Sequence, residues 1–130
     1  MKIRRSGFAV LLIVLSVNGK FALASGPQDR EMNDLAGSSG CNLCHNLESK
    51  IPGAQQILPY GPGWKDIARR YKGDTNAVDK LTRVVRQGSG PDPVRHWKNK
   101  TSVTEMLPNA AEISETDARK LVAWILSLDN

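Results

Sequence analysis

The chain has 130 residues, which is the size of one small domain. Its formal net charge is +5, from 18 Lys and Arg against 13 Asp and Glu. The first 24 residues hold four of the cations and no acid, so the remainder carries only +1, from 14 cations against 13 acids. No basic excess remains there to neutralise phosphates, which argues against a nucleic-acid-binding protein.

The N-terminal segment has the three parts of a secretory signal peptide. Lys2, Arg4 and Arg5 precede an apolar run over residues 8–17, and Ala22-Leu23-Ala24 follows. An uncleaved membrane anchor is the alternative, but the run is shorter than the roughly 20 apolar residues that span a bilayer. We predict a signal peptide over 1–24, a domain over 25–130, and a periplasmic protein with no membrane span after cleavage.

The first half of the domain is predicted to hold two short helices and a long loop. Met32, Leu35 and Ala36 recur at helical spacing and predict a helix over 31–40. Segment 47–63 contains three prolines and three glycines, so it is predicted to be a loop. A second helix is predicted over 64–71.

The second half is predicted to hold two further helices. An apolar stripe that includes Leu81 and Val85 predicts a helix over 77–87, ended by Gly88. Residues 89–100 are predicted to be a loop. A capping box at Ser114 to Asp117 then opens the last helix, which reaches Leu128. No segment indicates a strand, so the fold class is all-α.

The five residues Cys41-Asn42-Leu43-Cys44-His45 form the pattern C-x-x-C-H, which is typical of c-type haem attachment. Two thiols at this spacing add to the two vinyl groups on one edge of a porphyrin, and the next residue ligates the iron. A thioredoxin-type redox pair would need a βαβ context, which the pattern lacks. A zinc site would need His96 as its fourth ligand, at the wrong spacing. We predict one covalent haem, bound by Cys41 and Cys44, with His45 as an iron ligand.

The second axial position of an electron-transfer haem is usually closed by Met or His. Met32 lies on the helix before the haem motif and is poorly placed for it. His96 and Met106 remain as candidates from the residues alone.

Three further segments resemble small bacterial class I cytochromes c, in the order found in that family. Met106-Leu107-Pro108-Asn109 before the last helix resembles the family's ligand loop. Tyr60 to Ala68 resembles the Gly-Pro-x-aromatic-Lys segment, and Leu81 to Gly88 resembles the third helix. The similarity covers most of residues 41–128.

This resemblance implies a class I cytochrome c fold, with the first and last helices crossing and one haem between helices and long loops. Met106 would be the sixth ligand, and Asn109 would hydrogen-bond near its sulfur. The Pro62 carbonyl would accept a hydrogen bond from His45 Nδ1, and Trp97 would contact a haem propionate. Thr104 and Glu105 precede Met106 where the family usually has proline, and the loop from Gly88 is longer than in short members.

The expected function is single-electron transfer without catalysis. The partners would be a periplasmic dehydrogenase, reductase or terminal oxidase. Two alternatives remain open: a tightly bound cytochrome subunit of a periplasmic dehydrogenase, and a five-coordinate haem protein that binds gases. Lys65, Arg69, Arg70 and Lys72 are interpreted as a solvated helix face, with docking of an acidic partner as the alternative.

Overall fold

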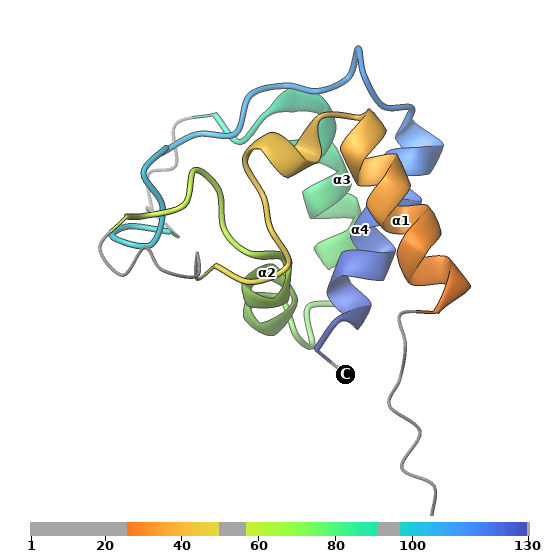
Figure 1. The fold of residues 1–130 in the computed structure, drawn as a ribbon, viewed down its shortest axis with the longest axis horizontal. Coiled ribbons are helices and arrows are strands. Elements are labelled where there is room, and N and C mark those ends of the chain that lie inside the picture. The colour runs from red at the N-terminus through yellow and green to blue at the C-terminus, as the bar shows by residue number, and fades with distance from the viewer. Residues whose placement is uncertain (1–25, 50–56, 91–96, 130) are drawn as a thin grey trace, which may run out of the picture.

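The computed structural model describes residues 26–49, 57–90 and 97–129. They contain helices and no strand, as the all-α prediction requires. The elements are α1 (Pro27–Ser38), the short 3-10 helix η1 (Cys41–Leu43), α2 (Trp64–Arg70), α3 (Ala77–Gln87) and α4 (Glu115–Ser127). Figure 1 shows α1, α3 and α4 gathered together, with α2 and the long connections beside them. No helix in the described ranges is long and apolar enough to cross a membrane.

The core is built around α4, which packs against α1, α2 and α3. Trp124 of α4 is buried and meets the buried Trp64 of α2 edge to face, with ring centroids 5.3 Å apart. Such aromatic pairs stabilise beyond the area that they bury. On the α1 side, Met32 and Ala36 close the same core. The predicted crossing of the first and last helices is therefore confirmed.

Helix α1 begins four residues before the predicted start at residue 31. Pro27 occupies its first turn, where a missing N–H costs nothing, and Asp29 accepts a hydrogen bond from the Gly26 N–H at 3.0 Å. The helix ends at Ser38 and not at Gly40, because Gly40 takes a left-handed φ of 72°. That turn directs the chain out of α1 and into the two cysteines.

The other helices lie close to their predictions. The range of α3 is as predicted, and Gly88 at φ 81° follows it. The predicted cap of α4 is present, since the Ser114 hydroxyl accepts a hydrogen bond from the Asp117 N–H at 3.1 Å.

Candidate haem site

Cys41 begins the single turn of η1, and Cys44 directly follows that turn. His45 N–H donates to the Cys41 carbonyl at 3.0 Å and Cys44 N–H donates to the same oxygen at 3.2 Å, so the motif is one closed turn. Both thiols are free. Burial raises the pKa of the partly buried Cys41 thiol, which keeps it protonated at neutral pH. A protonated thiol is a weaker nucleophile than a thiolate.

The His45 imidazole is held by one ring nitrogen. Its Nδ1 lies 2.8 Å from the Pro62 carbonyl oxygen, which can only accept, so Nδ1 carries the proton. The Nε2 lone pair is then left for a metal, as in many metal sites where a hydrogen bond to the other ring nitrogen orients a histidine ligand. Burial lowers the pKa of His45 and outweighs this hydrogen bond, so the ring is neutral and able to ligate.

Gly61 provides the space in which the His45 ring lies. A Cβ at this position would come within 2.7 Å of His45 Cε1 and 3.0 Å of the Cys44 carbonyl oxygen. The Gly61 N–H donates to that same carbonyl at 2.8 Å, so the two segments are in direct contact. Only glycine permits an approach this close. As one of the glycines of segment 47–63, Gly61 predicts only a loop; the Gly61-Pro62 pair is the sequence signal for its second role.

The donors in the haem motif fit a covalent haem. Within five consecutive residues the motif holds two unpaired thiols and one imidazole. The Pro62 carbonyl binds Nδ1 of that imidazole and so orients its Nε2. Within the described part of the chain, no three His, Cys, Asp or Glu side chains gather to hold a metal ion.

The loop that carries Met106 is fastened to the end of α3. Met106 N–H donates to the Ser89 hydroxyl at 2.9 Å, and Ser89 N–H donates to the Met106 carbonyl at 2.9 Å. A Cβ on Gly88 would come within 2.8 Å of the same carbonyl, so a side chain there would displace the loop. The Met106 side chain is partly buried.

Asn109 joins this loop to the segment that precedes the cysteines. Its backbone N–H donates to the Val85 carbonyl at 3.0 Å, and its side-chain amide donates to the Ser39 carbonyl at 3.0 Å. Ser39 O also lies 3.9 Å from the Cys41 sulfur. Asn109 thus connects α3, the methionine loop and the haem motif. Its expected hydrogen bond near the Met106 sulfur stays a prediction.

Two sequence expectations lie outside the described residues. The first is the proposed signal peptide over 1–24, and with it the domain boundary at residue 25. The second is His96, the alternative axial ligand.

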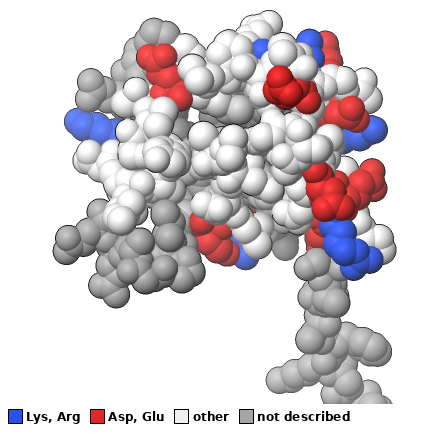
Figure 2. Space-filling model, turned by 45° about the horizontal axis from the view of Figure 1, so that its top comes forward, with Lys and Arg blue, Asp and Glu red and all other residues white. Residues whose placement is uncertain are grey.

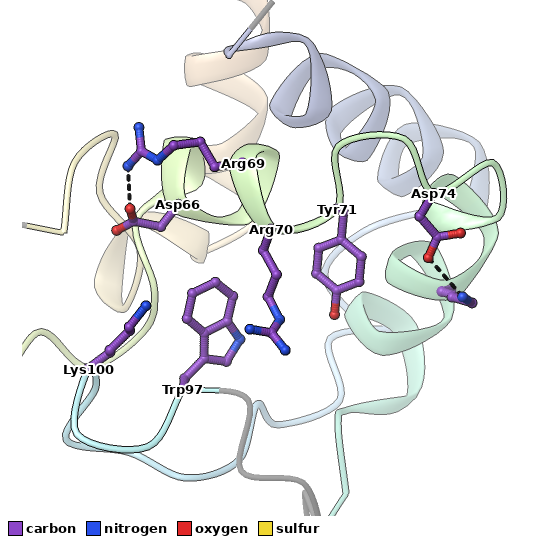
Figure 3. Close-up of a pocket in the computed structure, with 8 residues that line it drawn as sticks. Asp66, Arg69, Arg70, Tyr71, Asp74, Trp97 and Lys100 are labelled. Atoms are coloured by element: carbon purple, nitrogen blue, oxygen red, sulfur yellow. Dashed lines mark hydrogen bonds and ion pairs between the residues drawn. The ribbon is translucent and has the colours of Figure 1, made fainter.

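Trp97 lies apart from the haem motif, against α2. Its ring is 5.4 Å from the Arg70 guanidinium and 6.0 Å from the Lys100 ammonium. These side chains line a cavity of about 720 Å³ that none of the predicted thiol or iron ligands lines (Figure 3). The predicted contact of Trp97 with a haem propionate stays a prediction.

The basic cluster on α2 is largely engaged with local partners. Lys65 pairs with Glu48 at 2.6 Å, and Arg69 pairs with Asp66. Lys72 donates to the Asp129 backbone carbonyl at 2.9 Å. Three of its four cations therefore serve the fold, which favours the interpretation of a solvated helix face.

Large apolar side chains are exposed beside both ligand segments. Leu43, between the two cysteines, is 80% exposed, and Leu107, directly after Met106, is 79% exposed. The face in Figure 2 has few charged side chains near its centre, and charges of both signs lie towards its margin. Large apolar side chains that are exposed next to a site are typical of protein contact surfaces.

Comparison with known proteins agrees with this geometry. The family model described as "Cytochrome c" matches residues 29–129. A cytochrome c-551 of Allochromatium vinosum is 37% identical over 94 residues, which cover 72% of this chain and 82% of that protein. A cytochrome c-551 of Pseudomonas aeruginosa is 29% identical over 121 residues, which cover 90% of this chain and 93% of that protein.

Solved structures show the same relationship. The crystal structure of Nitrosomonas europaea cytochrome c552 matches with a TM-score of 0.55 and 31% identity, over 74% of this chain and 98% of that one. The class 1 cytochrome MtoD of Sideroxydans lithotrophicus matches with a TM-score of 0.53 and 27% identity. The chain therefore belongs to the cytochrome c family, with its class I all-α fold and covalently bound haem c.

Proposed function

We propose that this chain is a periplasmic mono-haem cytochrome that carries single electrons between redox proteins and catalyses no reaction of its own. Cys41 and Cys44 would hold the haem covalently, and His45 and Met106 would ligate its iron. The observation that carries the proposal is the 2.8 Å contact between His45 Nδ1 and the Pro62 carbonyl, directly after the two free thiols.

The bound haem supplies the one-electron chemistry. The chain's own residues would hold the haem in one geometry, and this keeps the reorganisation energy of electron transfer small. The Pro62 carbonyl fixes the tautomer and the plane of the His45 ring. Ser89 holds the Met106 backbone through two hydrogen bonds, so the proposed sixth ligand does not depend on a free loop.

A six-coordinate iron has no open position for a substrate or a gas, so a protein with such an iron is an electron carrier. Electrons would pass to partners over a short contact. The exposed Leu43 and Leu107 are suited to form such a contact, because exposed apolar side chains mark sites of protein contact. Periplasmic dehydrogenases, reductases and terminal oxidases are the proposed partner classes.

The test is the absorption spectrum of Met106→Ala beside the wild type, both matured in a host that attaches haem. We expect a sulfur-to-iron charge-transfer band in the oxidised wild type and its loss in the variant. Met32→Ala is the matched control, because Met32 is buried in the core and its loss should leave the band in place. Rapid CO binding by the reduced wild type, with no such band, would contradict the proposal and favour a gas-binding protein.

A further inference from the structure

The peptide group between Pro62 and Gly63 is hydrogen-bonded at both of its polar ends. Its carbonyl oxygen, on Pro62, accepts from His45 Nδ1 at 2.8 Å. Its N–H, on Gly63, donates to the Ser49 hydroxyl at 2.7 Å. Because the C=O and N–H of one peptide share a resonance system, a hydrogen bond at one end polarises the other end. The support of the His45 ring therefore extends beyond Pro62.

Ser49 connects this peptide group to a carboxylate. Its hydroxyl donates to Asp66, since an ionised carboxylate can only accept, and its lone pairs are left for the Gly63 N–H. Gly63 is buried, and Ser49 and Asp66 are partly buried. Hydrogen bonds that are shielded from water in this way are stronger and polarise one another.

Asp66 places a negative charge at the far end of these hydrogen bonds. Burial opposes its ionisation, but the hydrogen bonds from Ser49 and Arg69 and the charge of Arg69 hold its pKa below the ordinary value. Figure 3 shows Arg69 bonded to this carboxylate. Arg69 binds Oδ1 and Ser49 binds Oδ2, so each oxygen has its own donor.

Ser49 occupies a place that a helix cap would normally close by itself. Asp66 is the third residue of α2, from which a side chain often reaches back to the N–H of the residue before the helix. Here that N–H belongs to Gly63, and the Ser49 hydroxyl lies between it and Asp66. A Cβ on Gly63 would come within 2.5 Å of the Ser49 nitrogen and 2.7 Å of its hydroxyl oxygen, so glycine permits this approach.

We propose that Ser49 and Asp66 are positioning residues for His45, and that their hydrogen bonds through the Pro62–Gly63 peptide lower the reduction potential of the bound haem. This set of hydrogen bonds is called the Asp66 relay below. The inference rests on the proposed function, in which His45 is an iron ligand. An anion at the end of the relay makes the Pro62 carbonyl a stronger acceptor and Nε2 of His45 more basic. A more basic ligand stabilises ferric iron more than ferrous iron, which lowers the potential.

The experiment measures the reduction potential of the haem-loaded wild type, Ser49→Ala, Ser49→Thr and Ser127→Ala. Ser49→Ala breaks the relay without changing any charge, so we expect its potential to shift upward. Ser49→Thr keeps the hydroxyl and should return the potential to the wild-type value. Ser127→Ala is the matched control, because its partly buried hydroxyl donates to the Trp124 carbonyl outside the relay. Equal potentials for Ser49→Ala and Ser127→Ala would overturn the inference.

A second set of variants separates the relay from the charge of Asp66 acting through space. Asp66→Asn should raise the potential more than Glu48→Gln, which removes a carboxylate beside Ser49 that pairs with Lys65. In the Ser49→Ala background, Asp66→Asn should give a smaller shift than in the wild type, because only the through-space effect is left. Equal shifts in the two backgrounds would remove Asp66 from the relay. If Ser49→Ala does not mature, equal shifts for Asp66→Asn and Glu48→Gln overturn the inference.

Two further readouts separate this inference from the proposed function. The Nδ1 proton resonance of His45 in the reduced protein reports the hydrogen bond itself, and it should move upfield in Ser49→Ala and stay in place in Ser127→Ala. A pyridine haemochrome assay reports attached haem. Wild type without attached haem would refute the proposed function and this inference with it. Haem-loaded variants with the wild-type potential and the wild-type resonance would refute this inference alone.

Discussion

The two proposed axial ligands are held in different ways. His45 lies on a segment that is bonded to its neighbour at several consecutive positions: Gly61 N–H to Cys44 O, Trp64 N–H to Asn46 O, and Lys65 N–H to Leu47 O. Met106 is held by a few contacts that reach far along the chain, to Ser89 and, through Asn109, to Ser39. We infer that the histidine side is built as a rigid support and that the methionine side is the part that yields first.

Gly61→Ala should have the largest effect, because it places a methyl group in the rigid segment that supports His45. The new methyl would meet the His45 ring and the Cys44 backbone, neither of which is free to retreat. We expect a loss of about 2 kcal/mol in the free energy of unfolding, measured by urea denaturation. Gly37→Ala is the control, since its added Cβ would meet its nearest atom at an ordinary 3.5 Å. Equal stability of the two variants would contradict the close packing described.

Asn109→Ala should follow, because it leaves the Ser39 carbonyl, in a residue only 3% exposed, without its amide partner. A buried acceptor left unpaired costs about 1–3 kcal/mol. On heating, we expect the near-red methionine band of this variant to disappear before the helical circular dichroism does. Simultaneous loss of both signals at the wild-type temperature would refute the linking role.

Ser89→Ala should have a smaller effect, since it removes one hydrogen bond to the Met106 N–H at a position open to solvent. We expect about 0.5–1 kcal/mol in unfolding free energy. The sharper measurement is the rate at which added imidazole displaces the methionine, which should rise relative to the wild type. An unchanged rate would mean that Ser89 does not hold the ligand loop.

The smallest expected effect is a pH dependence away from both ligand segments. The Trp124 indole N–H donates to Asp29 at 2.9 Å, and this bond, with that from Gly26, lowers the pKa of Asp29. A carboxyl with a lowered folded pKa stabilises the protein above its unfolded pKa, and that contribution disappears as pH falls through the folded value. Asp29→Asn should reduce the acid sensitivity of thermal unfolding, and a scan showing the same acid slope as the wild type would contradict this.

Local patterns predict a helix well where its start or stop signal lies directly beside its apolar stripe in the sequence. The range of α3 follows from its apolar stripe and Gly88, and the cap of α4 from Ser114. The predicted start of α1, at residue 31, is four residues late, because the apolar spacing begins at Met32 and the turn that holds Pro27 and the Gly26–Asp29 cap precedes it. Apolar spacing alone does not reveal a cap that lies before the first apolar residue.

The candidate site divides in the same way. The C-x-x-C-H pattern is local, so its residues could be named from the sequence. The partner of the Asn109 side chain, Ser39, lies 70 positions away. Lys65 and Arg69 of α2 pair with Glu48 and Asp129, which come from separate segments. Contacts of this kind arise from tertiary packing, and no periodicity in one sequence records them.

Covalent haem attachment is tested by the mass of the mature protein from a haem-attaching host, measured intact after unfolding in acid. We expect the mass of the chain plus one haem, and loss of that added mass in the double variant Cys41→Ala, Cys44→Ala. Wild-type protein that carries two free thiols and the unmodified chain mass would contradict it.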